Sequence, residues 1–126
     1  MSVPLNIAII DDDEDMRLAL EGLFESHDFS PSCYEGAASF LDALAGNAPD
    51  VVVTDLQMKD IDGIMLTRAL KAHGCPAPVI LITAFATPMV RASAEQLGVY
   101  CVLEKPFEPN ELLKCVSRAA GSAQSE

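Results

Sequence analysis

The sequence is short of basic residues. Only 8 lysines and arginines stand against 19 aspartates and glutamates among 126 residues, so the formal net charge is −11. Proteins that bind nucleic acid or anionic membrane use clustered lysine and arginine to neutralise phosphates. The few basic residues form no patch along this chain. The composition therefore argues against direct binding of nucleic acid or of a membrane.

Long apolar runs are also missing. The longest, residues 79–86, is interrupted by Thr83 and is far shorter than the about 20 residues that a membrane-spanning helix needs. The first residues, MSVPLN, contain neither the basic nor the apolar segment of a signal peptide. We therefore expect a cytoplasmic protein without a membrane segment.

Cysteines are few and widely spaced. The four are Cys33, Cys75, Cys101 and Cys115, and no two of them form a CxxC motif. Zinc ligation and disulfides are alternatives, but this spacing favours buried free thiols in a reducing compartment.

Half of the residues are hydrophobic, which is enough for a full core in one domain of this length. Neither internal repeats nor linkers interrupt the chain. The last residues are small and polar, so the sequence predicts one domain over 1–120 and a flexible polar tail over 121–126.

Short apolar runs alternate with segments of helical periodicity. The apolar runs predict buried strands at 6–10, 50–54, 78–83 and 99–103, and a weaker strand at 30–34 that contains Pro31. The periodic segments predict helices at 15–27, 37–45, 64–73, 88–97 and 109–120. Five strand–helix units with near-continuous apolar strands indicate a doubly wound α/β domain with a parallel sheet covered on both faces.

Functional side chains follow the four strong strands at the points where the strands end. They are Asp11, Asp12 and Asp13, then Asp55, then Thr83, and finally Lys105 with Pro106. In open parallel sheets, ligands bind at the carboxyl ends of the strands. We therefore expect several carboxylates, one hydroxyl and one ammonium group to converge in a single crevice.

Carboxylates in such a crevice repel one another by about 4 kcal/mol per close pair at an effective dielectric constant near 20. Either one of them is protonated or a cation binds between them. An all-oxygen site suits a hard cation such as Mg²⁺. Together with Lys105 and Thr83, the site contains the parts that phosphoryl transfer requires.

Four stretches of the chain resemble the signature stretches of response-regulator receiver domains of two-component signalling. In order they are IAIIDDDEDMR, VVVTDLQMKDIDG, VILITAF and LEKPF, and together they span nearly the whole chain. The resemblance implies a flavodoxin-like (βα)5 fold whose five-stranded parallel sheet has the order 2-1-3-4-5.

The resemblance also implies a role for each site residue. Asp55 is the expected phospho-acceptor, Asp12 a direct ligand of Mg²⁺ or Mn²⁺, and Asp11 a ligand through water. Asp55 and the backbone carbonyl of Gln57 complete the expected metal ligands.

Three further residues are expected to contact the phosphoryl group. They are Thr83 through its hydroxyl, Ala84 through its backbone amide and Lys105 through its ammonium group. The bond before Pro106 is expected to be cis, and Gly63 is expected to permit the turn into the third helix.

By this resemblance the chain takes a phosphoryl group from a histidine kinase or a phosphotransfer protein. It promotes its own phosphorylation and slow dephosphorylation but turns over no separate substrate, so we do not expect an enzyme. The signal would pass to a downstream protein target, or to an output domain if the chain is a truncated regulator. A homodimer is a further open expectation.

Two positions depart from the family pattern. Lys59 replaces the usual proline, and Val102 replaces an aromatic residue whose rotamer tracks phosphorylation. We hypothesise that signalling avoids the aromatic swing, or that Tyr100, two residues earlier on the same strand face, partly substitutes. Phe85 cannot orient an attacking water, which predicts slow self-dephosphorylation.

Two other interpretations compete. Asp11-x-Asp13 imitates the nucleophile and acid of a haloacid-dehalogenase-like phosphatase, although Glu14 follows where that family has another pattern. A pseudo-receiver that only binds is the second, and the full acidic, threonine and lysine set argues against it. Asp13, Glu14 and Asp15 have a simpler expected role, because acids favour the first turn of a helix.

Overall fold

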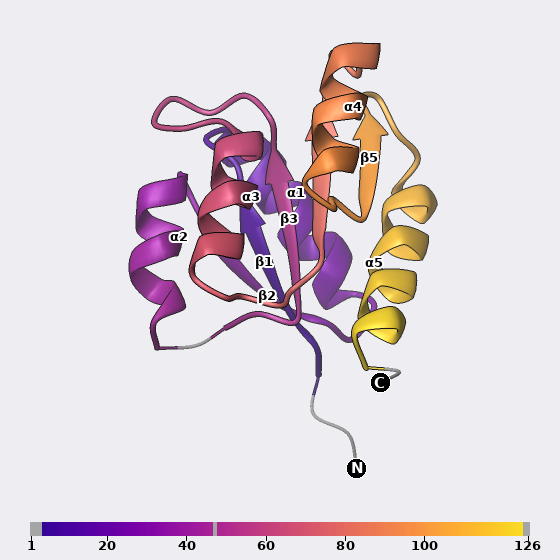
Figure 1. The fold of residues 1–126 in the computed structure, drawn as a ribbon. Coiled ribbons are helices and arrows are strands. Elements are labelled where there is room, and N and C mark those ends of the chain that lie inside the picture. Colours follow the sequence, from indigo (N-terminus) through magenta and orange to yellow (C-terminus); the bar gives the residue numbers. More distant parts are fainter. Residues whose placement is uncertain (1–3, 47, 125–126) are drawn as a thin grey trace.

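The computed structural model describes residues 4–46 and 48–124 of the chain. In this part, five strands and five helices alternate (Figure 1). They are β1 (Asn6–Ile10), α1 (Glu14–Glu25), β2 (Ser30–Tyr34), α2 (Ala37–Leu44), β3 (Val51–Asp55), α3 (Gly63–Ala72), β4 (Val79–Thr83), α4 (Pro88–Gln96), β5 (Cys101–Glu104) and α5 (Pro109–Gln124).

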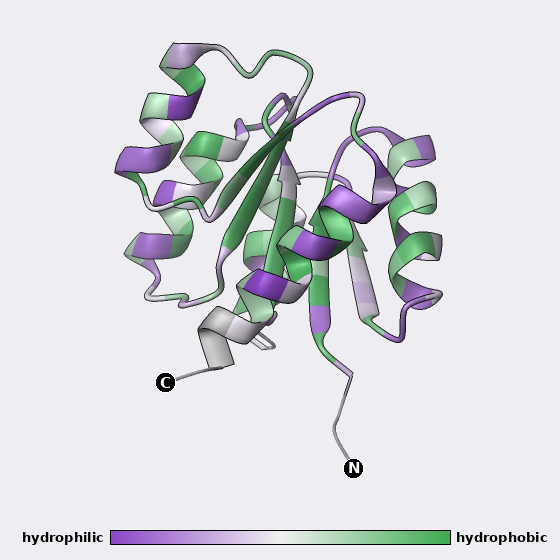
Figure 2. Ribbon diagram, turned by 90° about the vertical axis from the view of Figure 1, so that its right-hand side faces the viewer, coloured by the Kyte–Doolittle hydropathy of each residue, from purple (hydrophilic) through white to green (hydrophobic). Residues whose placement is uncertain are grey.

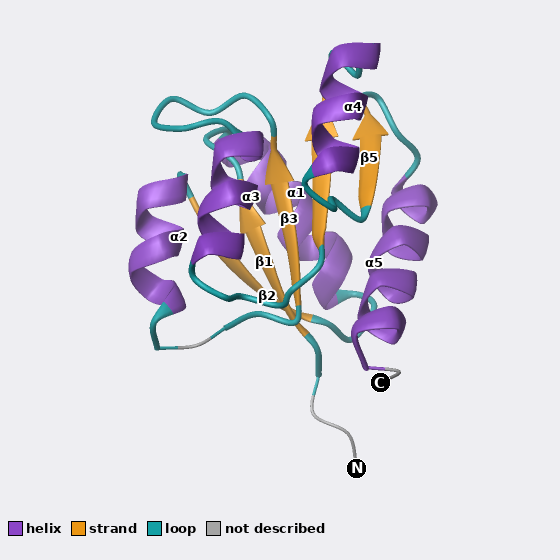
Figure 3. Cartoon of the chain, viewed as in Figure 1, coloured by secondary structure: helices purple, strands orange, loops and turns teal. Residues whose placement is uncertain are grey.

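The strands form one parallel sheet in the order β2-β1-β3-β4-β5, so the predicted fold class and strand order are confirmed. All strand arrows point to the same edge of the sheet (Figure 3). Pro31 is tolerated because β2 is an edge strand, where a missing backbone N–H leaves no inner partner unsatisfied.

Two apolar clusters hold the helices against the sheet. Alternate residues of β1 serve opposite faces: Ile7 and Ile9 pack with α1 and α5, whereas Ala8 and Ile10 pack with α2 and α3. This alternation follows from the two-residue period of a strand. Figure 2 shows the central strands as the most hydrophobic part of the chain, with hydrophilic residues on the helices that cover them.

The helices begin where the sequence supplies capping groups. Asp13 accepts a hydrogen bond from the amide of Asp15 and caps α1, so its simpler expected role is confirmed. Asp62 and Thr87 cap α3 and α4 in the same way. At α2 the N-cap is Gly36, which has no side chain for this purpose.

Most element boundaries differ from the sequence prediction by one or two residues, and two differences affect the interpretation. β5 begins at Cys101, two residues later than predicted, so Tyr100 precedes the strand. α5 continues to Gln124, so it includes residues 121–124 of the predicted tail, while residues 125–126 lie outside the described part. Gly121 costs about 1 kcal/mol in a helix but does not have to end one. None of the described helices is long and apolar enough to cross a membrane.

Gly63 at the start of α3 is required for a reason other than the one predicted. A Cβ atom there would lie 2.6 Å from Leu81 Cδ1 and 2.7 Å from the carbonyl oxygen of Asp55. Its backbone is not in the left-handed region. The close approach of α3 to the end of β3, and not conformational freedom, therefore excludes a side chain at this position.

Candidate functional site

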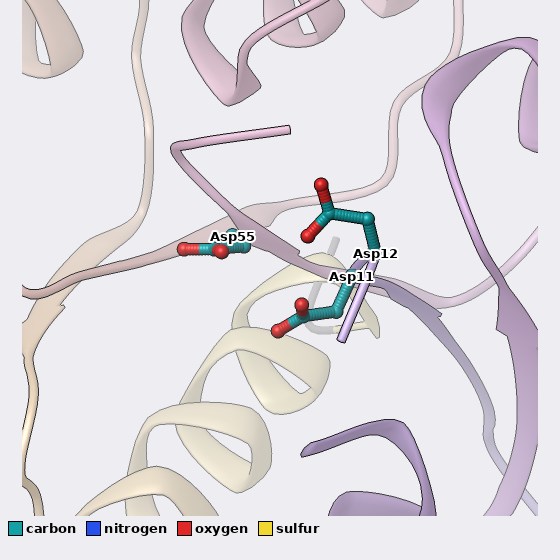
Figure 4. Close-up of side chains that lie close together, drawn as sticks. All are labelled: Asp11, Asp12 and Asp55. Carbon is teal, nitrogen blue, oxygen red and sulfur yellow. The ribbon is translucent and has the colours of Figure 1, made fainter. Parts of the chain in front are cut away.

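The acidic residues of the first and third strands meet at the carboxyl edge of the sheet. Asp11 and Asp12 follow β1, and Asp55 is the last residue of β3, the neighbour of β1. One carboxylate oxygen from each of the three lies within 4.8 Å of the others, and Figure 4 shows the three side chains around one space. The predicted acidic crevice is therefore present.

Lys105 reaches the same crevice from the other side. It follows β5, and its Nζ lies 3.6 Å from Asp55 Oδ1. The peptide bond between Lys105 and Pro106 is cis, as predicted. The backbone amide of Lys105 donates to the carbonyl oxygen of Thr83, which fixes the lysine beside the end of β4.

Burial shapes the ionisation of two of the carboxyl groups. Asp11 is 3% exposed and Asp55 is 9% exposed. Loss of hydration raises the pKa of both, and the Asp55 charge further raises the pKa of Asp11. Lys105 and a hydrogen bond from the Gln57 backbone act against the rise at Asp55 without cancelling it. Without a bound cation, keeping Asp11 and Asp55 ionised therefore costs folding free energy.

Backbone groups hold the acidic loop after β1 in place. Asp11 accepts a hydrogen bond from the amide of Asp13 through its side chain, at 2.9 Å. The guanidinium group of Arg17 donates to the carbonyl oxygen of Asp11 at 2.6 Å. No sequence motif points to Arg17, although its place on the first turns of α1 directs it back toward the loop.

Thr83 and Ala84 lie where β4 ends. Thr83 is fully buried, and its hydroxyl oxygen accepts a hydrogen bond from the amide of Phe85 at 3.0 Å. Its own hydroxyl proton remains available to a ligand. Ala84 is exposed and, together with Lys105, lines an apolar hollow beside the site.

Asp60 ties the loop after β3 to α2. Its carboxylate accepts hydrogen bonds from the amide of Ala38 at 2.9 Å and from the amide of Ile61 at 2.8 Å. The Ala38 bond is the largest cause of a lowered pKa at Asp60. Asp60 thus caps α2 from another part of the chain, which periodicity and motif spacing could not reveal.

A second unanticipated contact holds the loop after β4. Glu104, the residue before Lys105, accepts a hydrogen bond from the amide of Ala86 at 3.3 Å. The Arg91 side chain donates to the carbonyl oxygen of Ala86, also at 3.3 Å. An acid at the end of β5 and a base on α4 therefore brace the loop that carries Ala84 and Phe85.

The residues present fit a hard divalent cation. All side-chain donors in the cluster are carboxylate oxygens, which Mg²⁺ prefers over nitrogen and sulfur. Burial raises the pKa of Asp11 and of Asp55, so their ionised forms are favoured by added positive charge nearby. A cation held by Asp11, Asp12 and Asp55 would supply it.

Tyr100 lies at the opposite end of β5 from this site. Its amide donates to the carbonyl oxygen of Val79, the first residue of β4, whereas Thr83 and Lys105 lie at the far end of these strands. Four residues of strand separate the two ends by roughly 13 Å. This position favours the first half of our hypothesis, signalling without an aromatic swing, over substitution by Tyr100.

The four cysteines are free, as expected, but each is partly exposed and none is fully buried. Their surroundings differ. Cys101 Sγ and Cys115 Sγ lie 2.8 Å apart, a contact that sequence spacing did not indicate.

Fold and site together define a flavodoxin-like α/β domain with an acidic site and a lysine at the switch edge of its sheet. The family model of the response regulator receiver domain matches residues 7–117. The chain belongs to this family, and the predicted resemblance is confirmed.

The chain is also similar in sequence to characterised transcriptional regulators. The chain is 36% identical over 124 residues to the transcriptional regulatory protein FixJ of Bradyrhizobium diazoefficiens, covering 98% of this chain and 60% of that protein. It is 33% identical over 118 residues to the DNA-binding transcriptional regulator NtrC of Escherichia coli, covering 94% of this chain and 25% of that protein. The chain thus spans less than two thirds of the length of each of these relatives.

Solved structures match the fold. The crystal structure of full-length FixJ from B. japonicum superposes with a TM-score of 0.90 at 35% identity, over 98% of this chain and 61% of that one. The FixJ-N crystal structure gives a TM-score of 0.86 at 29% identity and covers 95% of both chains. The chain is therefore a receiver domain of a two-component response regulator, a family in which accepting phosphoryl groups and binding Mg²⁺ are general.

Proposed function

We propose that Asp55 is the residue that accepts the phosphoryl group in this receiver domain. One observation carries the proposal: Asp55 is the carboxylate that faces both the acidic pair, Asp11 and Asp12, and the ammonium group of Lys105. A nucleophile in phosphoryl transfer needs positive charge on both sides of the transferring group. Asp55 is the group in the crevice with a cation site on one side and a lysine on the other.

The metal would be Mg²⁺ or Mn²⁺, held by Asp11, Asp12, Asp55 and the backbone carbonyl of Gln57. When bound, such a cation neutralises charge on the carboxylate cluster and on phosphoryl oxygens. Arg17 and the amide of Asp13 hold Asp11 in place for this purpose, so the acidic loop needs little rearrangement.

Lys105 would hold a phosphoryl oxygen on the side away from the metal, after exchanging its present contact with Asp55. The hydroxyl of Thr83 would donate to another oxygen, and the backbone amide of Ala84 would donate to the same group. These residues position and neutralise the phosphoryl group and act on no separate substrate. The protein would therefore promote its own phosphorylation without being an enzyme in the usual sense.

The switch would begin at Thr83. Its hydroxyl oxygen accepts the amide of Phe85, and the next residue, Ala86, is held by Glu104 and Arg91. A movement of Thr83 toward the phosphoryl group would thus act on the loop between β4 and α4. A two-state equilibrium needs about 5.5 kcal/mol of differential interaction for a full reversal.

A protein partner is favoured by the surface beside the site. An open apolar hollow of about 880 Å³ adjoins Lys105 and Ala84, and its other wall is formed by α1. Leu18 on that helix is 57% exposed. A phosphohistidine-bearing histidine kinase or phosphotransfer protein must contact this neighbourhood to bring its phosphoryl group to Asp55. The partner would lie in the cytoplasm, and the signal would continue to a protein target or to an output domain of a longer regulator.

The test is acetyl phosphate with Mg²⁺, followed by intact mass and peptide mapping. We expect one phosphoryl group on Asp55 in wild type and none in Asp55→Ala, with no reaction in the presence of a chelator. Labelling that persists in Asp55→Ala, or that maps to Asp11, would contradict the proposal and revive the phosphatase-like interpretation.

A second experiment tests the docking surface. Leu18→Glu should leave labelling by acetyl phosphate unchanged and slow transfer from an autophosphorylated histidine kinase. Equal slowing with both donors would mean that the substitution damages the site itself and would remove the support for docking at α1.

A further inference from the structure

Two cysteines on consecutive elements meet between β5 and α5. Cys101 is the first residue of β5 and Cys115 lies in α5, 14 residues later, and their Sγ atoms are 2.8 Å apart. The two elements lie next to each other in Figure 1. Both side chains pack against the core cluster on this face of the sheet and remain partly exposed.

We propose that Cys101 and Cys115 form an oxidation site that takes small anionic disulfides of the oxidised glutathione class and closes to an intrachain disulfide. The sulfur atoms already lie within about 1 Å of bonding distance, since a disulfide bond is about 2.0 Å long. The oxidation therefore requires little movement of β5 or α5.

The charge around the pair favours an anionic oxidant. The guanidinium groups of Arg91 and Arg118 act electrostatically on Cys101. They are two of only 8 basic residues in a chain with a net charge of −11. Cys33 provides a contrast, because the carboxylates of Glu21 and Glu25 act on it together with the single base Arg17.

The chemistry proceeds by two exchanges. Burial and the contact with Cys115 raise the pKa of Cys101 to about 12, and because the two thiols are coupled, either can make the first attack. When Cys115 attacks first, it loses its proton, bonds to one sulfur of oxidised glutathione and releases one glutathione. Cys101 then loses its proton, attacks Cys115 Sγ and releases the second glutathione. Two protein thiols are oxidised and one glutathione disulfide is reduced to two thiols.

The experiment uses the native wild-type protein. It is incubated with oxidised glutathione, its remaining thiols are alkylated, and the products are mapped by peptide mass. We expect a Cys101–Cys115 disulfide with Cys33 and Cys75 still alkylated, and loss of this preference in guanidinium chloride. Alkylation of Cys101 and Cys115 after the treatment, or pairing with Cys33 or Cys75 instead, would overturn the proposal.

Three variants test the pairing and the oxidant class. Cys101→Ser and Cys115→Ser should each stop with one glutathione on the remaining cysteine of the pair and form no intrachain disulfide. Arg118→Gln should slow the reaction with oxidised glutathione several-fold and leave the reaction with neutral hydroxyethyl disulfide unchanged. Equal effects on both reagents would refute the assignment to anionic disulfides.

Discussion

Lys105 Nζ lies 3.6 Å from Asp55 Oδ1, although β4 lies between β3, which ends at Asp55, and β5, which Lys105 follows. The lysine reaches across the end of β4 from the loop after β5. Its side chain is 26% exposed and that of Asp55 is 10% exposed, so solvent screens the pair only in part. The contact joins the two halves of the site before any phosphoryl group is present.

Replacing Lys105 should separate metal binding from phosphorylation. In Lys105→Ala, Mg²⁺ should bind several-fold more tightly, because a positive charge next to the carboxylates is removed. Labelling by acetyl phosphate should fall at least about tenfold, which corresponds to about 1.4 kcal/mol of lost transition-state stabilisation. Titration of Mg²⁺ and the initial labelling rate measure the two effects. Lys114→Ala, on the exposed surface of α5, is the control, and a parallel loss of both properties would contradict the assigned role.

The acidic cluster predicts a pH-dependent effect of Mg²⁺ on stability. The pKa of Asp11 and of Asp55 is raised above 3.8 in the folded state. Stability from these groups is present below pH 3.8 and is lost as the pH rises through their folded pKa values. At neutral pH the metal-free protein should therefore be stabilised by Asp55→Asn, and wild type should be stabilised by added Mg²⁺.

Calorimetry at several pH values measures the Tm of Asp55→Asn and of wild type with and without Mg²⁺. Both gains in Tm should shrink as the pH falls toward 4, where the carboxyl groups of wild type take up protons. A destabilising effect of Asp55→Asn at pH 7.5 would show that the Lys105 contact outweighs the cost of burial.

Phe85 should slow the loss of the phosphoryl group. It follows Ala84 at the end of β4, and its side chain is 60% exposed. A bulky apolar group beside the site cannot orient water and excludes it. Phe85→Ala should therefore dephosphorylate several-fold faster than wild type, measured as the decay of the phosphorylated mass after the donor is removed. Met89→Ala removes another exposed apolar side chain, on α4, and should leave the decay unchanged. An unchanged decay in Phe85→Ala would contradict the prediction that Phe85 slows the loss of the phosphoryl group.

Asp60 should stabilise the fold by capping α2 from the neighbouring loop. Asp60→Ala removes the acceptor for Ala38 at a helix whose N-cap is Gly36, which should cost about 1 kcal/mol of unfolding free energy. The lowered pKa of Asp60 sets the sign of the pH effect. Its stabilisation is present above pH 3.8 and is lost as the pH falls through the lower, folded pKa.

Denaturant unfolding of wild type and Asp60→Ala between pH 7 and pH 2.5 measures this difference. The difference in unfolding free energy between wild type and Asp60→Ala should be largest near neutral pH and should disappear at the acid end. Asp42→Ala, an exposed acid of α2, should show no comparable gap. Equal unfolding free energies of wild type and Asp60→Ala at pH 7 would mean that water replaces the Asp60 cap without loss.

Much of the fold follows from local patterns in the chain. Apolar runs such as Val51–Val53 have no alternative to a buried strand, and Pro88 after Thr87 fixes the start of α4. Boundaries are harder to predict, because helix ends depend on small energy differences. Gly121 predicts the end of a helix, whereas α5 continues past it.

The sequence by itself determined which side chains stand at strand ends, because a parallel sheet brings all carboxyl ends to one edge. This rule is sufficient to assign Asp11, Asp12, Asp55 and Lys105 to one site. Only the tertiary structure decided which helix Asp60 caps and that Cys101 meets Cys115. Asp60 contacts a helix that lies one strand earlier in the chain, and the Cys101–Cys115 contact depends on how α5 packs beside β5. Local periodicity carries no signal for either distance, because both depend on how helices pack on the sheet.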